Sequence, residues 1–241
     1  MQMPKRFSST TIFIFATLLV SVRAIADGTV VDKVYAPYVQ ALERELEYRV
    51  LVQNDDNDTL DDVQIHRLGF GLSWSDRWFT ELYLIGVRTN TDSLSVEAYE
   101  LETKWQLTEQ GEYWADWGLL FELETGRDRD FWEYATNLLV SKEWGRWVTT
   151  ANVGLIYEWG DDIKNEWETT LSLQGRYRLT RGFEPALEFY SGQDAKALGP
   201  AFVGDIRTGG RTKLHWEVGL IFGLDSESPD HTFRGLLEFE F

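Results

Sequence analysis

Charged side chains recur at every second position in several stretches of this 241-residue chain. Residues two apart on an extended strand point to the same side of a sheet, so such charges share one face. The pairs with this spacing are Glu100 and Glu102, Glu122 and Glu124, and Arg176 and Arg178. Glu188 and Glu217 belong to other predicted strands and fall on the polar face of those strands. A face rich in carboxylates attracts cations and repels anions. We therefore take these residues as candidates for the lining of a solute path.

The three histidines are the residues that could support catalysis. Lipid-directed or proteolytic enzymes activate a Ser or Asp with a neighbouring His. His66 falls on the apolar face of its predicted strand, the face that would meet lipid in a membrane barrel. Its polar neighbours Asp62 and Gln64 make no recognisable nucleophile arrangement. His215 falls on the inward parity and His231 in a predicted loop. We expect no enzyme, and a lipid-modifying enzyme remains the less favoured alternative.

Residues 54–62 form a run of acidic and amide side chains that offers hard oxygen ligands to Ca²⁺. The run lacks the Gly and the final Glu of an EF-hand loop, which favours a solvated acidic loop. The chain has no cysteine, so disulfides and thiolate chemistry are excluded. We find no zinc spacing and no nucleotide-binding loop. The sequence therefore predicts no catalytic residue, no cofactor and no resident metal.

The elements that must carry the charged pairs are β-strands, because hydropathy alternates with period two from Glu43 to the last residue. In the final segment Phe233, Leu237 and Phe239 share one face, and charged residues share the other. We predict strands at residues 43–53, 63–74, 78–88, 94–107, 113–125, 132–144, 147–159, 167–179, 183–190, 199–207, 213–224 and 232–241. These lengths suit tilted strands that cross a membrane, which need roughly 9–11 residues.

The predicted connections alternate in length. Those after even strands are short, at 75–77, 108–112, 145–146, 180–182 and 208–212. Those after odd strands are mostly longer and more acidic, as at 54–62, 160–166, 191–198 and 225–231. Periplasmic turns and external loops alternate in this way. We therefore predict an all-β fold, a closed antiparallel transmembrane β-barrel of about 12 strands over residues 43–241, with both termini periplasmic.

A soluble β-sandwich is the structural alternative, because its strands also alternate. The apolar faces here are nearly free of charge, and aromatic residues gather at their ends, as Trp147 and Trp159 do. Such rings form girdles at the depth of the lipid headgroups. Pro185 and Pro200 fit a closed barrel poorly, because proline donates no ladder hydrogen bond. We expect Pro200 to open its strand.

The first 26 residues read as a signal peptide: Lys5 and Arg6, an apolar stretch at 11–22, and a small-residue cleavage site at 24–26. A membrane anchor is disfavoured because a helix needs roughly 20 apolar residues to cross the hydrocarbon core. Cleavage would remove three basic residues and change the formal net charge from −17 to −20. Such a chain repels nucleic acid. Residues 27–42 are predicted to form a periplasmic N-terminal tail.

The C-terminal run at 236–241 resembles the assembly signal of bacterial outer-membrane barrels. This resemblance implies that Phe239 and Phe241 are recognised by the barrel-assembly machinery. Stretches at 34–39, 77–81, 111–116, 198–200 and 219–224 resemble a family of small, largely uncharacterised proteobacterial outer-membrane proteins, and the similarity spans most of the mature chain. More loosely, the chain is similar to barrels associated with phenol-degradation pathways and copper resistance. Copper handling is disfavoured because Met occurs only at positions 1 and 3.

At the strand positions predicted to face the barrel interior, acidic residues outnumber basic ones by more than two to one. Eight-stranded barrels are filled by their own side chains and 16–18-stranded ones leave a channel, so twelve strands lie between these cases. We expect a narrow, cation-leaning channel or transporter for small solutes. A filled structural or adhesive barrel without conductance is the alternative. The expected partners are outer-membrane lipid and lipopolysaccharide, the assembly machinery, and small cationic or neutral solutes.

Overall fold

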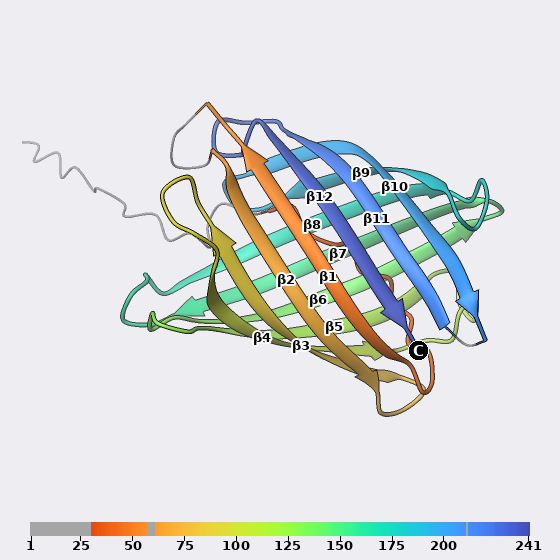
Figure 1. The fold of residues 1–241 in the computed structure, drawn as a ribbon. Coiled ribbons are helices and arrows are strands. Elements are labelled where there is room, and N and C mark those ends of the chain that lie inside the picture. Colours follow the sequence, from red (N-terminus) through yellow and green to blue (C-terminus); the bar gives the residue numbers. More distant parts are fainter. Residues whose placement is uncertain (1–29, 57–60, 211) are drawn as a thin grey trace, which may run out of the picture.

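The computed structural model describes residues 30–56, 61–210 and 212–241. Twelve antiparallel strands each pair with the next, and the last pairs with the first, so the sheet closes into a barrel (Figure 1). This topology confirms the predicted fold class and shows that the sandwich alternative is wrong. The predicted signal peptide lies outside the described residues. In the described part of the chain, no helix is long and apolar enough to cross a membrane.

The strands lie close to their predicted positions. Their bounds are β1 Arg44–Asn54, β2 Val63–Ser73, β3 Trp78–Arg88, β4 Ser95–Gln106, β5 Asp116–Gly126, β6 Trp132–Trp144, β7 Trp147–Trp159, β8 Glu166–Tyr177, β9 Glu184–Ser191, β10 Lys196–Gly209, β11 Thr212–Gly223 and β12 His231–Glu240. The largest differences at strand starts are in β5 and β10, each displaced by three residues. His231, predicted in a loop, is the first residue of β12.

Pro200 lies inside β10 and does not open it, so that expectation is wrong. Lys196 already pairs with Ser191 of β9, which starts the strand four residues earlier. On the β11 side, the register of the described strands assigns no partner to Gly199 or Pro200. The proline therefore falls where the ladder does not need its missing N–H donor.

The outer surface of the barrel is apolar and the inner surface is polar. Along β12, Phe233, Leu237 and Phe239 are exposed, while the alternate residues Arg234 and Glu238 are buried. A soluble protein shows the reverse distribution. A barrel in lipid shows this one, because only alternate residues face the hydrocarbon.

Aromatic pairs lie at both ends of this apolar belt. Trp78 stacks on Trp105 across β3 and β4, with ring centroids 4.9 Å apart. At the opposite end Tyr157 and Trp167 pair across β7 and β8, with centroids 4.6 Å apart. Amphipathic rings at both margins are typical of the headgroup regions of a membrane.

The two ends of the barrel differ, and we name them by their connections. The turn end carries the connections after even strands, including residues 74–77 and 145–146, and the C-terminal Phe241, whose N–H donates to the carbonyl of Arg44 at 2.8 Å. The loop end carries the connections after odd strands, including residues 160–165 and 224–230. The lengths alternate less regularly than predicted, since the turn end also holds the connection 107–115. The periplasmic side of the turn end stays a prediction.

We call residues 30–42 the lumen segment: residues 30–39 lie inside the barrel, and residues 40–42 are exposed at the turn end. At the loop end Val30 lies beside Gly192, and at the turn end the side-chain amide of Gln40 donates to Glu240 at 3.1 Å. The segment therefore runs the length of the barrel before β1 begins. The sequence predicted a periplasmic tail at residues 27–42, but residues 30–39 run through the interior of the barrel instead.

Candidate functional site

Tyr35 fixes the middle of the lumen segment to two distant strands. Its backbone N–H donates to Asn152 Oδ1 at 2.8 Å, and Asn152 Nδ2 donates back to the Tyr35 carbonyl at 2.8 Å. The Tyr35 hydroxyl donates to Glu102 Oε1 at 2.7 Å. Asn152 belongs to β7 and Glu102 to β4, so these contacts hold the segment across the barrel. A segment without a sheet ladder thus satisfies its backbone through side chains.

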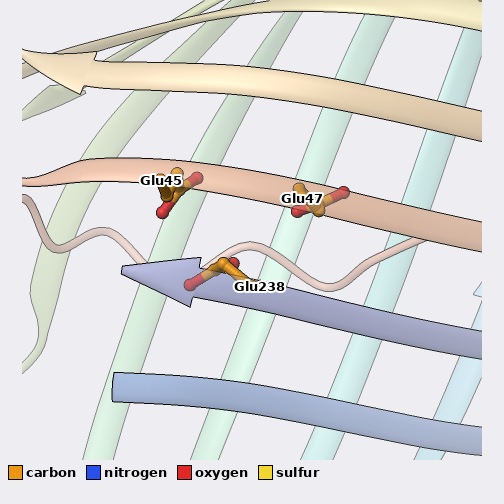
Figure 2. A group of neighbouring side chains, drawn as sticks. All are labelled: Glu45, Glu47 and Glu238. Atoms are coloured by element: carbon orange, nitrogen blue, oxygen red, sulfur yellow. The ribbon is translucent and has the colours of Figure 1, made fainter. Parts of the chain in front are cut away.

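Lys33 enters a cluster of three carboxylates. This carboxylate cluster consists of Glu45 and Glu47 on β1 and Glu238 on β12, with an oxygen of each within 4.8 Å of the others (Figure 2). The Lys33 ammonium donates to Glu47 at 2.6 Å and to Glu238 at 3.0 Å. These are the distances of charge-assisted hydrogen bonds. The cluster therefore already binds one ammonium group, supplied by the chain itself.

Two fully buried arginines tie the lumen segment to the wall. Arg49 donates to Asp32 and to Glu47, and its side chain has no exposed surface. Arg234 donates to Glu188 and Glu217, both at 2.8 Å, and to the Asp32 carbonyl. Removing one partner from such a buried network is strongly destabilising. The network therefore fixes the segment near its loop-end half.

The charge states of the lumen segment, which lies outside the twelve strands, follow from these contacts. Burial alone would raise the pKa of Asp32, but the positive charges of Arg49 and Arg67 outweigh it and lower the pKa to about 2. Burial alone would lower the pKa of Lys33, but Glu238 and Glu47 raise it well above its usual value. Asp32 is therefore ionised and Lys33 protonated at neutral pH.

The lumen segment divides the interior into two cavities. The loop-end cavity has a volume of about 630 Å³, and the turn-end cavity has a volume of about 190 Å³. Lys33 and Tyr35 line both. The boundary between the two spaces therefore lies at these two side chains.

Strand register aligns the inward carboxylates into an oblique row. Residues opposite each other on successive strands run from Glu238 to Glu47, across Gly69 and Tyr83, and on to Glu100, Glu124, Glu133 and Glu158. We call the six glutamates of this row the acidic track. Glu238 lies near the turn end of its strand, and Glu133 and Glu158 lie one residue from the loop end of theirs. Because barrel strands tilt, one row of neighbours climbs from one end of the lumen to the other.

Within two groups, Glu238 with Glu47 and Glu100 with Glu124, Glu133 and Glu158, neighbouring members lie on adjacent strands roughly 4.8 Å apart. Gly69 of β2 and Tyr83 of β3 separate the two groups. Glu47 and Glu238 lie in the carboxylate cluster at the turn end, and Glu100, Glu124, Glu133 and Glu158 line the loop-end cavity. The track therefore has one group of carboxylates in the carboxylate cluster and a second group in the wall of the loop-end cavity. The inward parity of each residue could be read from the sequence. Their alignment could not, because alternation does not specify register.

The remaining candidate residues occupy different places in the lumen. Glu102 binds Tyr35, Glu122 accepts a hydrogen bond from Asn137, and both line a cavity. Arg176 lines the turn-end cavity and lies 3.3 Å from Glu184. Glu188 and Glu217 are joined through Arg234. Glu188 and Glu217 therefore share one arginine, whereas Glu122 binds a different side chain, that of Asn137.

Arg178 takes no part in either cavity lining. It follows the last residue of β8 and donates to Glu143 at 2.7 and 2.6 Å at the turn end. Its guanidinium is about a third exposed. The most informative lumen residues, Lys33 and Tyr35, were missed because they precede the alternating region. Their only sequence signal was the close spacing of charged and aromatic residues before β1.

In the described part of the chain, His66 and His215 each have hydrogen-bond partners. His66 contacts the Tyr48 hydroxyl at 2.7 Å on the outer face, a partner that is neither a carboxylate nor a serine. His215 lies between Asp205 at 2.8 Å and Glu217 at 3.1 Å. The candidate calcium loop includes residues 57–60, which lie outside the described chain, and its Asp62 pairs with Arg88 at 3.2 Å.

Comparisons with known proteins identify the fold. No family model and no curated protein matches the chain. An outer membrane channel from Pseudomonas putida F1 is 17% identical, with a TM-score of 0.56 over 87% of this chain and 98% of that one. The KdgM porin is 12% identical (TM-score 0.53, covering 82% and 99%), and the NanC porin is 10% identical (TM-score 0.53, covering 81% and 98%).

The chain therefore has the fold of bacterial outer-membrane barrels, and its apolar belt is the surface that such a barrel presents to lipid. The similarity at these identities concerns the fold alone. The resemblance to a small proteobacterial family, the loose association with phenol degradation or copper resistance, and the assembly role of Phe239 and Phe241 stay predictions.

Proposed function

We propose that this protein is a narrow, cation-preferring channel of the outer membrane for small solutes. The observation that carries the proposal is the acidic track, whose members line the loop-end cavity and reach the carboxylate cluster near the turn end. Rows of carboxylates select cations in channels. The structural neighbours, which are named as channels and porins, support the same class.

The electrostatics of the loop-end cavity support the preference for cations. Ten acidic residues and three basic residues line it. A cleft with one dominant sign of charge and low-dielectric walls raises the local concentration of counter-ions. Cations would therefore gather at this cavity before they reach the narrower section at Lys33 and Tyr35.

The proposal is tested by planar-bilayer recording of the refolded mature protein under a KCl gradient. We expect small conductance and a reversal potential of the sign that K⁺ selectivity gives. The triple variant E124Q/E133Q/E158Q removes three charges from the track and should move the reversal potential toward zero. The matched control is E143Q, because Glu143 lies on the inward parity but lines neither cavity; its reversal potential should stay unchanged.

A filled barrel with a structural or adhesive role is the second candidate. The buried networks of Arg49 and Arg234 and the lumen segment favour it, because they occupy much of the interior. Conductance no greater than in the detergent control would contradict the channel and support this candidate. A measurable conductance with no change in the triple variant would contradict the role of the track.

A further inference from the structure

The carboxylate cluster holds more negative charge than its contacts neutralise. Glu47 accepts from both Lys33 and Arg49, and Glu238 accepts from Lys33. Lys33 donates to Glu47 and Glu238 but not to Glu45, although a carboxylate oxygen of Glu45 lies within 4.8 Å of an oxygen of each of the other two. Figure 2 shows Glu45 and Glu47 on one strand and Glu238 on the neighbouring strand. The Lys33 ammonium and the Arg49 guanidinium thus face three carboxylates, and only Lys33 contacts more than one of them.

A fourth carboxylate, that of Glu81, lies in the same cavity. Glu81 on β3 and Glu45 on β1 are both opposite Gly71 of β2, so only a glycine separates them in the register. Glu81 is 3% exposed, and its Oε1 has no hydrogen-bond partner among the described residues. Glu81, Glu45 and Glu238 all line the turn-end cavity. A buried acceptor without a partner is costly, so this oxygen marks a place for a donor.

The groups around the cluster suit an alkylammonium ion. An ammonium has three N–H donors and no acceptor, which matches a set of carboxylate oxygens at hydrogen-bonding distance. Phe79, Leu120 and Tyr35 line the same cavity and offer apolar surface to a short alkyl chain. The cavity of about 190 Å³ has room for only a small organic ion.

We propose that the carboxylate cluster together with Glu81 is a binding site for the ammonium group of small organic amines, and that Lys33 is a tethered occupant which such an amine displaces. The proposal builds on the proposed channel, because it names the class of solute that the lumen recognises. Lys33 competes from within the same chain, and tethered groups act at effective concentrations on the order of millimolar. Only amines supplied near or above that level would replace it in the wild-type protein.

The test is calorimetric titration of n-butylammonium chloride into the refolded full mature chain in detergent. The variant K33M keeps the length and apolar stem of the side chain but removes its charge. We expect K33M to bind n-butylammonium at least about tenfold more tightly than the wild type, because the tethered competitor is gone. Adding E238Q to K33M should weaken binding by about tenfold, because a charge-assisted hydrogen bond is lost.

The matched control is K104M. Lys104 lines the same cavity, but its ammonium lies over the Phe79 ring, 5.4 Å from the centroid, rather than in the cluster. Its removal should change the affinity much less than the removal of Lys33 does, because Lys33 alone of the two donates hydrogen bonds to the cluster. If K33M does not refold, K33Q replaces it, because the amide keeps two donors toward Glu47 and Glu238.

Three results would overturn the proposal. They are equal affinity of the wild type and K33M, an equal gain in K104M, and a K33M site that takes up Ca²⁺ but not n-butylammonium. Binding in detergent does not require conduction. A protein that binds the amine but does not conduct would therefore contradict the channel alone, and one that conducts without binding the amine would contradict this site alone.

Discussion

The two cavities of one lumen have different chemistry. The loop-end cavity is about three times larger and is lined by ten acidic and three basic residues, with an apolar wall that includes Leu51, Ile65 and Ile85. The turn-end cavity is lined by seven acidic and four basic residues, together with His215. The same alternation of strands produces both surfaces. The difference arises because the lumen segment crosses between them and because basic residues from β4, β8 and β11 gather at the turn end.

This comparison shows that a barrel interior need not be uniformly polar. Val31 of the lumen segment packs with Leu51, Ile65 and Ile85 in one buried apolar cluster. That cluster packs the segment against β1, β2 and β3, while four carboxylates of the acidic track, from β4 to β7, line the same cavity. Burial of apolar area therefore fixes the segment on one side and leaves the charged side of the loop-end cavity open to solutes.

Removing the lumen segment should abolish the difference between the two cavities. Replacing residues 30–40 with a Gly/Ser sequence of equal length would merge the two cavities, because Lys33 and Tyr35 form their boundary. We expect single-channel conductance in planar bilayers to rise several-fold. The same replacement of residues 224–227 at the loop end, none of which lines either cavity, is the control and should leave conductance near the wild-type value. Equal conductance in all three proteins would show that the segment does not limit the path.

Removing the buried guanidinium of Arg234 should give the largest loss of stability. The variant R234M leaves Glu188 and Glu217 buried without their cation, which costs about 3–5 kcal/mol. Urea unfolding followed by tryptophan fluorescence measures the loss. A change under about 1 kcal/mol would mean that these carboxylates find other partners or are protonated.

Truncating a side chain of the apolar wall tests how much this wall of the loop-end cavity contributes to stability. Leu51 is 2% exposed, so Leu51→Ala should lower the free energy of unfolding by about 2–4 kcal/mol through lost transfer energy and a new cavity. Leu224→Ala is the control, because Leu224 is exposed outside the strands and should cost much less. The same urea titration compares them. Equal losses of unfolding free energy in the two variants would indicate that the buried apolar wall stabilises the barrel no more than an exposed leucine does.

The smallest effect is expected at the turn-end rim. Arg178 and Glu143 are both partly exposed, so R178Q should lower the free energy of unfolding by no more than about 1 kcal/mol despite the two short hydrogen bonds. The loss should shrink further in high salt, because exposed charges are screened. A loss as large as that of R234M would contradict the distinction between rim and interior.

The sequence was sufficient to predict the strands, the outward apolar faces and the closed barrel. Period-two alternation determines which face a side chain takes, and for Phe233 and Glu238 it did so correctly. Alternation does not determine which residues lie opposite each other, so the track from Glu238 to Glu158 needed the register. The position of Pro200 was missed because the ladder gap on its β11 side leaves no local sequence signal.

The lumen segment could not be predicted for a different reason. Its hydrogen bonds go to side chains from distant strands, such as Asn152 and Glu102, and not to a neighbouring strand. Local periodicity reports only regular partners. A segment held in this way looks like an unstructured tail, although Tyr35 is among the buried residues of the protein.

The passage of the lumen segment through the barrel has a topological consequence. Twelve strands alone would return the chain to its starting side, but the segment adds one more traverse, so the described chain starts at the loop end with Val30 and finishes at the turn end with Phe241. The polypeptide is also free of cysteine. Single thiols introduced beside Val30 and beside Phe241 would thus lie at opposite ends of the barrel, and labelling each of them would show which end faces which side of the membrane.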